Sequence, residues 1–127
     1  MSLDITPLVP AGRQVIESYG NGGFRVAGVF HTGSVIVLSE RTLAWPVGAA
    51  DPVTEATLAP LFAAAGSLEI LAIGCGPRFL PLPEALRAVL RTRGIALEWM
   101  DTGAACRTFN VLWAEGRPAA AALIAVD

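Results

Sequence analysis

The sequence contains no lysine and a single histidine, His31, and charged residues make up 16% of the chain. Its formal net charge is −2 and its isoelectric point is near 5.3. All nine basic residues are arginine, with one local cluster at Arg87, Arg91 and Arg93. Nucleic-acid binding requires a stripe of positive charge, usually with stacking aromatic residues beside it. The composition therefore predicts a protein that does not bind nucleic acid.

Cysteine is also scarce: Cys75 and Cys106 are widely separated and have no paired-ligand spacing with each other or with the histidine. A zinc site is therefore not expected, and we predict neither a metal nor any other cofactor. Without an export signal, free thiols are favoured over a disulfide. Cys75 lies between two glycines that leave its thiol unshielded, but a nucleophile also needs a neighbouring base. We interpret both cysteines as inert, and the reactivity of Cys75 stays an open question.

Long apolar runs are absent, although 54% of the residues are hydrophobic. No run approaches the ~20 residues that a membrane-spanning helix needs. Residues 1–13 also lack the basic start and apolar block of a secretory signal. We therefore expect a cytoplasmic protein with no transmembrane segment. The length of 127 residues predicts one domain spanning 1–127, since neither a repeat nor a linker divides the chain.

The first part of the chain is typical of β-structure. Residues 2–12 predict an irregular lead-in. Residues 14–19 and 24–29 flank a Gly-Asn-Gly-Gly run, which favours a β-hairpin because several residues there adopt positive φ at low cost. Residues 34–38 are β-branched and apolar, so a buried strand is predicted. Residues 43–47 form a short extended segment that its proline restricts to the edge or end of a sheet.

A helix is predicted for residues 54–65. Asp51 or Thr54 is the expected N-terminal cap, and Gly66 is the expected end. Pro60 lies inside this segment and forces a kink or an early break, because proline has no backbone N–H and clashes with the preceding turn.

The second part alternates strands and helices. An apolar strand at 68–73 precedes a helix at 83–93 that has proline at its first position and glycine after its last. Further strands are predicted at 95–100 and 119–126, with another helix between them. Strand and helix alternation at this spacing indicates parallel strands, right-handed crossovers and helices that cover the sheet.

The helix predicted within residues 101–117 has the clearest capping and periodicity signals in the sequence. Asp101 or Thr102 can cap its start, and Gly116 can adopt the left-handed conformation that ends it. An apolar stripe at helical spacing is formed by Ala105, Phe109, Leu112 and Trp113. Another face carries Gly103, Arg107 and Asn110. We expect the helix to pack on a sheet by its stripe and to present these polar residues to something else.

Polar and small residues should meet at one rim of the sheet, where the carboxyl ends of parallel strands lie together. The residues expected there are Gly74, Cys75, Gly76, Arg78, Asp101, Thr102 and Gly103. A helix N-terminus beside an arginine can bind an anion. The alternative is a plain rim with Asp101 as a cap and Arg78 in solvent. A dinucleotide loop matches only in part, because Phe79 occupies the third glycine position and prolines follow.

Several segments resemble the Mth-domain family: Asp101-Thr102, Ala105-Cys106, Thr108-Phe109-Asn110, Leu112, Glu115-Gly116-Arg117 and residues 120–124. The resemblance runs over nearly the whole chain, although Cys75 replaces the threonine or other small residue usual there. It implies an α/β fold of three layers, with a central mixed sheet, helices and an additional N-terminal β-hairpin. It carries no catalytic residues, and the family's eukaryotic members imply roles in protein assembly or regulation.

The leading hypothesis is a non-enzymatic protein-interaction or assembly-factor-like module with an unknown protein partner. Its expected surface is an exposed face near Trp45, Pro46 and the rim. Arg107, Thr108, Asn110, Glu115 and Arg117 are the candidate interaction residues. We expect Thr108 and Asn110 to bond to nearby backbone or to face a partner, and the three charged residues to pair locally.

Two further hypotheses stay open. A small-molecule or anion binder, or an enzyme, could use the rim formed by Gly74–Gly76 and 101–103. A homo-oligomer could form through an edge strand of the hairpin part, because an unpaired strand edge can pair with another chain.

Overall fold

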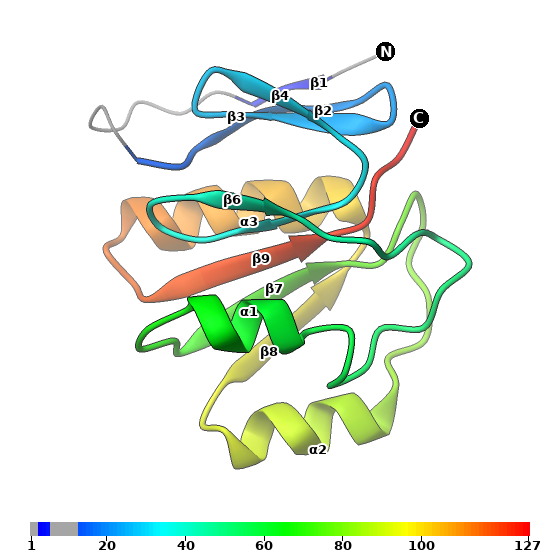
Figure 1. The fold of residues 1–127 in the computed structure, drawn as a ribbon, viewed down its shortest axis with the longest axis vertical. Coiled ribbons are helices and arrows are strands. Elements are labelled where there is room, and N and C mark those ends of the chain that lie inside the picture. The colour runs from blue at the N-terminus through cyan, green and yellow to red at the C-terminus, as the bar shows by residue number, and fades with distance from the viewer. Residues whose placement is uncertain (1–2, 6–12) are drawn as a thin grey trace.

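The computed structural model of the chain describes residues 3–5 and 13–127. Within these residues the backbone forms a four-stranded sheet and a five-stranded sheet, together with helices α1, α2 and α3. Figure 1 shows the small sheet above helix α3 (Thr102–Ala114), and β9 (Ala119–Leu123), the middle strand of the large sheet, below that helix. The predicted α/β class with a central mixed sheet is confirmed.

The small sheet is antiparallel, with its strands in sequence order β1-β2-β3-β4. Its strands are β1 (Leu3–Asp4), β2 (Ile16–Gly20), β3 (Gly23–Val26) and β4 (Val29–Thr32). The lead-in predicted to be irregular therefore contains a short strand, and most of its other residues lie outside the described part of the chain.

Two tight turns shape this sheet. Asn21 and Gly22 have φ of 55° and 75°, which is the left-handed pair that a two-residue hairpin turn requires. Ala27 and Gly28 repeat it with φ of 49° and 81°. The strand predicted to run from 24 to 29 therefore ends at Val26, and the predicted hairpin is extended by a further one. An alanine at positive φ is uncommon, which is why the sequence pattern missed this turn.

The large sheet has the order β6-β5-β9-β7-β8. Its strands are β5 (Val35–Val37), β6 (Thr42–Ala44), β7 (Ile70–Gly74), β8 (Ala96–Met100) and β9 (Ala119–Leu123). β7 pairs in parallel with both β8 and β9, and β5 pairs antiparallel with β9 and β6. The parallel pairing predicted for the second part is confirmed. β6 lies at the edge of the sheet, as Pro46 in the predicted segment 43–47 indicated.

The helices are α1 (Ala59–Ala64), α2 (Glu84–Thr92) and α3 (Thr102–Ala114). α2 follows Pro83 and is terminated by Gly94 in the left-handed conformation, with φ of 75°. α1 is shorter than predicted and has Pro60 in its first turn, where a missing N–H costs least. Neither predicted cap lies at the first residue of α1. Asp51 accepts a hydrogen bond from Gly48 N, and Thr54 caps the turn before the helix, where its Oγ1 accepts from Thr57 N at 3.2 Å.

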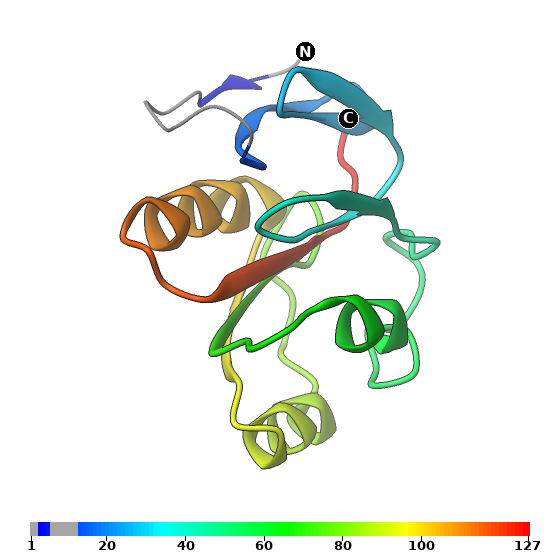
Figure 2. The same ribbon diagram turned by 60° about the vertical axis from the view of Figure 1, so that its left-hand side comes forward.

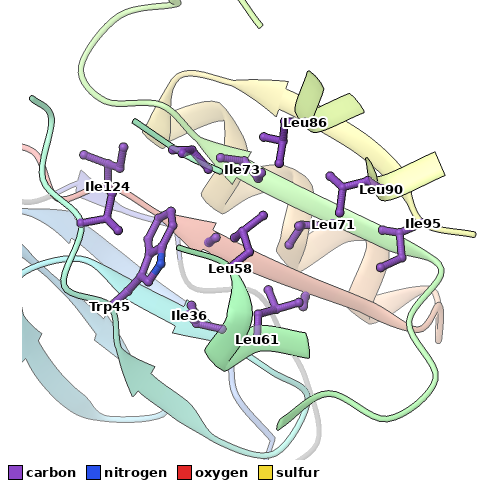
Figure 3. Packing of buried hydrophobic residues seen from close by; sticks show 14 of the residues in the cluster. Ile36, Trp45, Leu58, Leu61, Leu71, Ile73, Leu86, Leu90, Ile95 and Ile124 are labelled. Atoms are coloured by element: carbon purple, nitrogen blue, oxygen red, sulfur yellow. The ribbon is translucent and has the colours of Figure 1, made fainter. Parts of the chain in front are cut away.

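Both faces of the large sheet are buried. On one face, α1 and α2 pack through Leu58, Leu61, Leu86 and Leu90 onto strand residues that include Leu71 and Ile73. Figure 3 shows these side chains together with Trp45 and Ile124. The next residues along the strands, such as Val35, Ala72 and Ala121, face α3 instead. This alternation places two apolar layers around one sheet.

α3 lies between the two sheets (Figure 2). Its stripe residues Ala105, Phe109 and Trp113 pack with β5, β7 and β9, in one cluster with Ile16, Tyr19, Phe24 and Val26 of the small sheet. The small side chains of β9, four alanines followed by Leu123, leave room for the bulky helix residues above it. α3 is therefore buried on two sides, which a single apolar stripe did not predict.

Candidate functional site

The loops that leave β7 and β8 meet at the carboxyl end of the large sheet, as predicted. The backbone N–H of Thr102 donates to Gly76 O at 2.8 Å, and Cys75 N donates to Met100 O at 2.8 Å. In return, Gly76 N donates to Thr102 Oγ1 at 3.1 Å. The two loops therefore hold each other by direct hydrogen bonds.

Thr102 is the centre of this contact and is fully buried. Its hydroxyl donates to Ile124 O at 2.7 Å while it accepts from Gly76 N. The β7 residue Gly74 passes so close that a Cβ there would lie 2.7 Å from Thr102 Cα. The sequence pattern placed these residues together but did not indicate that Thr102 would be the buried link between three segments.

The N-terminus of α3 is already occupied by a carboxylate. Asp101 Oδ1 accepts from Ala104 N at 3.0 Å, so the predicted cap is confirmed. An anion approaching this helix end would meet the charge of Asp101, and the backbone N–H groups of Thr102 and Ala104 already have acceptors. Outside the loops there is a shallow depression of about 620 Å³, whose lining includes Tyr19, Gly76, Asp101, Gly103 and Val126.

The loop after Cys75 projects an apolar tip into solvent. Phe79 is 65% exposed and Leu80 is 42% exposed, and the neighbouring Arg78 is also exposed. The backbone behind this tip is held firmly. The buried Cys75 thiol donates to Arg78 O and accepts from Leu80 N, each at 3.4 Å, and Trp99 Nε1 donates to Leu80 O at 2.8 Å. The exposed tip is therefore an ordered feature.

The candidate interaction residues on α3 separate into two groups. Asn110 is buried and binds both backbone groups of Ile16, and Thr108 is half-buried with its hydroxyl 3.2 Å from Met100 Sδ. Arg107 is exposed, and its guanidinium donates to the Tyr19 hydroxyl at 3.3 Å. The element that Gly103 and Asn110 face is the small sheet, since Tyr19 lies against Gly103 and Asn110 bonds to the backbone of Ile16.

The end of α3 follows the predicted pattern at Gly116, whose φ is 76°. Gly116 N donates to Trp113 O and Arg117 N donates to Leu112 O, which is the Schellman arrangement that ends many helices. Glu115 and Arg117 are exposed. The local ion pairs predicted among Arg107, Glu115 and Arg117 do not form; within the described residues, the ion pair joins Arg93 and Glu55.

Trp45, Cys75 and Cys106 are all buried. Trp45 is only 2% exposed and donates from Nε1 to Thr57 O, so the exposed face predicted around it is wrong, although Pro46 is exposed. Both thiols are buried and free of a disulfide, and burial raises the pKa of the Cys106 thiol far above its ordinary value. That thiol is therefore unreactive in the folded protein.

Two absences hold for the described residues, 3–5 and 13–127. No group of three or more His, Cys, Asp or Glu side chains there is placed to hold a metal ion. In the same residues no helix has the length and apolar character needed to cross a membrane.

Comparison with known proteins assigns this arrangement to a family. The family described as "Protein of unknown function (DUF498/DUF598)" matches residues 16–124. The chain belongs to this family. It is 38% identical over 110 residues to NADH dehydrogenase (ubiquinone) 1 alpha subcomplex assembly factor 3 of Mus musculus. The match covers 86% of this chain and 59% of the mouse protein, so this chain spans little more than half of that relative.

Two solved structures show the same fold. A Bartonella henselae protein described as an outer membrane protein has a TM-score of 0.82 and 42% identity, covering 92% of this chain and 98% of that one. A Bordetella pertussis protein described as an Mth938-like domain has a TM-score of 0.75 and 28% identity, covering 96% and 92%. The predicted resemblance to the Mth-domain family is confirmed.

The structure adds residues that the sequence pattern did not single out. The sequence pattern marked Phe79 only as a departure from a dinucleotide loop and did not single out Leu80, although two consecutive large apolar residues between prolines are a visible signal. Tyr19 reaches both Arg107 and Gly103. No local pattern in the hairpin predicted those contacts.

Proposed function

We propose that this chain is a non-enzymatic protein-interaction module with an assembly-factor-like role, and that its contact surface is the tip Arg78-Phe79-Leu80 beside the rim. The observation that carries the proposal is the exposure of Phe79 and Leu80 on an ordered backbone. Aromatic and arginine side chains dominate binding energy at protein interfaces. A tip that is already ordered loses little conformational entropy on binding.

The relatives support the same role. The mouse protein is named as an assembly factor of NADH dehydrogenase (ubiquinone), and we extend that role to this chain as an aid in building an NADH dehydrogenase. The partner surface that suits the tip has an apolar pocket for Phe79 with a carboxylate nearby for Arg78. Cytoplasmic location stays a prediction.

A deletion strain tests the proposal. We expect loss of this protein to lower the amount of assembled NADH dehydrogenase on native gels and the NADH:quinone activity of membranes. The wild-type chain should restore both. The double variant Arg78→Ala, Phe79→Ala should restore them poorly, since it removes only exposed groups. Val111→Ala is the matched control, because Val111 is 56% exposed on α3, away from the tip. Unchanged assembly in the deletion strain contradicts the role, and full rescue by the double variant contradicts the surface.

Self-association through a strand edge is a second proposal. β4 is the last strand of the small sheet, and its residues Val29 and Phe30 are 57% and 40% exposed. Two copies could pair their β4 edges antiparallel, which is self-complementary. We expect a dimeric mass in light scattering that Phe30→Lys converts to a monomer. A monomeric wild-type protein would remove this proposal.

The alternative of a small-molecule or anion binder at the Gly74–Gly76 and 101–103 rim has less support. The backbone N–H groups of Cys75, Gly76, Thr102 and Ala104 have acceptors within the protein. The Asp101 carboxylate holds the helix end that an anion would use.

A further inference from the structure

A second depression lies at the opposite end of the large sheet from the rim. β9 pairs with β7 from Ala119 at one end to Leu123 at the other, and Leu123 is the residue opposite Gly74. The depression has a volume of about 520 Å³ and opens where β9 begins, between the end of β5, the end of α1 and the end of α3. Its size is within the range of small-molecule sites.

Three of the nine arginines line this depression, namely Arg13, Arg41 and Arg117. All three are exposed. Glu40 is the carboxylate that accompanies them in the lining. Among the described residues no carboxylate forms an ion pair with any of the three, since the ion pair found there joins Arg93 and Glu55. A chain of net charge −2 therefore has an excess of positive charge in the lining of this depression.

Hydrogen bonds hold the backbone near each of these arginines. Leu38 N donates to Arg41 O at 2.8 Å, and Gln14 N donates to Ser39 O at 3.2 Å. The guanidinium of Arg13 lies over the Trp113 ring, 4.7 Å from its centroid. Arg117 follows the glycine that ends α3, and its backbone N–H donates to Leu112 O at 3.1 Å.

We propose that this depression binds a small organic anion with at least two negative charges, of the diphosphate or polycarboxylate type. A guanidinium offers a planar fork of donors that matches phosphate and carboxylate oxygens. Three like charges around one cavity repel one another, and a bound dianion relieves that repulsion. The site is independent of the docking tip at the other end of the sheet, so either proposal can fail alone.

The test is a titration of the ¹⁵N-labelled protein with inorganic pyrophosphate and, separately, with citrate, at low ionic strength. We expect saturable amide shifts that are confined to residues 38–41, 66–68, 117, 119 and 120. Added salt should weaken the binding, because exposed charges are screened. Absence of saturable binding by both anions would overturn the proposal.

Variants locate the site. Arg117→Gln keeps the backbone bonds that end α3 and should weaken binding by about tenfold, the effect expected for losing one charge-assisted contact. Arg87→Gln removes the same charge from α2, outside the depression, and should leave binding within about twofold. Equal weakening by both variants would show attraction by net charge alone. Tighter binding of an oligoglutamate peptide than of both small anions would overturn the proposal, because the site would then be one for an acidic protein segment.

Discussion

Asn110 of α3 forms a pair of hydrogen bonds with the backbone of Ile16 in β2. Its Nδ2 donates to Ile16 O at 2.8 Å, and its Oδ1 accepts from Ile16 N at 3.1 Å. The two residues are 94 positions apart, and the contact lies in the buried layer between α3 and the small sheet. The side-chain amide thus acts as a neighbouring strand would, at a position where the β2–β3 register shifts.

Asn110→Ala should be strongly destabilising. It leaves a buried N–H and a buried C=O of Ile16 without partners, at a cost of about 3 kcal/mol in the free energy of unfolding. Urea denaturation followed by circular dichroism measures this. Thr108→Ala is the control, since Thr108 is half-buried and its hydroxyl approaches only a thioether; we expect a loss below about 1 kcal/mol. Similar losses for the two variants would contradict the role given to Asn110.

Gly103→Ala should destabilise the protein through Tyr19. A Cβ at Gly103 would lie 2.6 Å from the Tyr19 hydroxyl, and overpacking of this kind costs about 1–3 kcal/mol. Alanine also favours the helix over glycine by up to about 1 kcal/mol, so the net loss is smaller than the clash.

Tyr19→Phe provides the matching half of a double-mutant cycle. It removes the nearest clashing atom, and the next ring atom lies 3.0 Å from the added Cβ. We expect Gly103→Ala to cost less in the Tyr19→Phe background, as measured by urea denaturation. Additive effects would show that the two residues do not share this contact.

Thr102→Val should loosen the rim while preserving the shape of the side chain. The hydroxyl of the fully buried Thr102 links Gly76 N and Ile124 O. Its loss leaves one buried donor and one buried acceptor without partners, which lowers the free energy of unfolding by about 2–3 kcal/mol. Amide hydrogen exchange should become faster at Gly76 and neighbouring residues. Unchanged exchange there would show that the two loops are held mainly by other contacts.

The buried thiol of Cys106 should lower the free energy of unfolding at alkaline pH. Burial raises the pKa of its thiol above the ordinary value of 9.0, so the folded state holds the proton more tightly than the unfolded state. The stabilisation is complete below pH 9.0 and decreases as the pH rises above it, because only the unfolded chain then releases the proton. Urea denaturation between pH 8 and pH 10 measures the slope, and Cys106→Ala should reduce it. An equal slope in the variant would assign the effect to other groups.

The sequence predicted the second part of the chain well because its signals are local. Glycine after α2 and α3 and a carboxylate before α3 act within one or two turns of each helix. Parallel pairing then follows from strand and helix alternation. Prediction failed where a local signal was ambiguous, as at Ala27, whose positive φ is unusual for alanine, and in the segment before Pro60, where a helical composition forms only turns.

The candidate rim was also predictable in outline, since residues at the ends of adjacent parallel strands must lie near one another. Its internal hydrogen bonds were not. Whether Thr102 faces solvent or links three segments depends on how Ile124 and Gly76 approach it, and those residues lie 22 and 26 positions away.

By itself, the sequence determined the α/β class, the order of strands and helices in the second part, and the ends of α3, because propensity, capping and apolar periodicity act over a few residues. Only the tertiary structure decided that the small sheet covers the second face of α3, that Trp45 is buried, and that Arg13, Arg41 and Arg117 share one depression. Such placements depend on contacts between distant segments, and a pattern along one helix or strand does not state which surface will cover it.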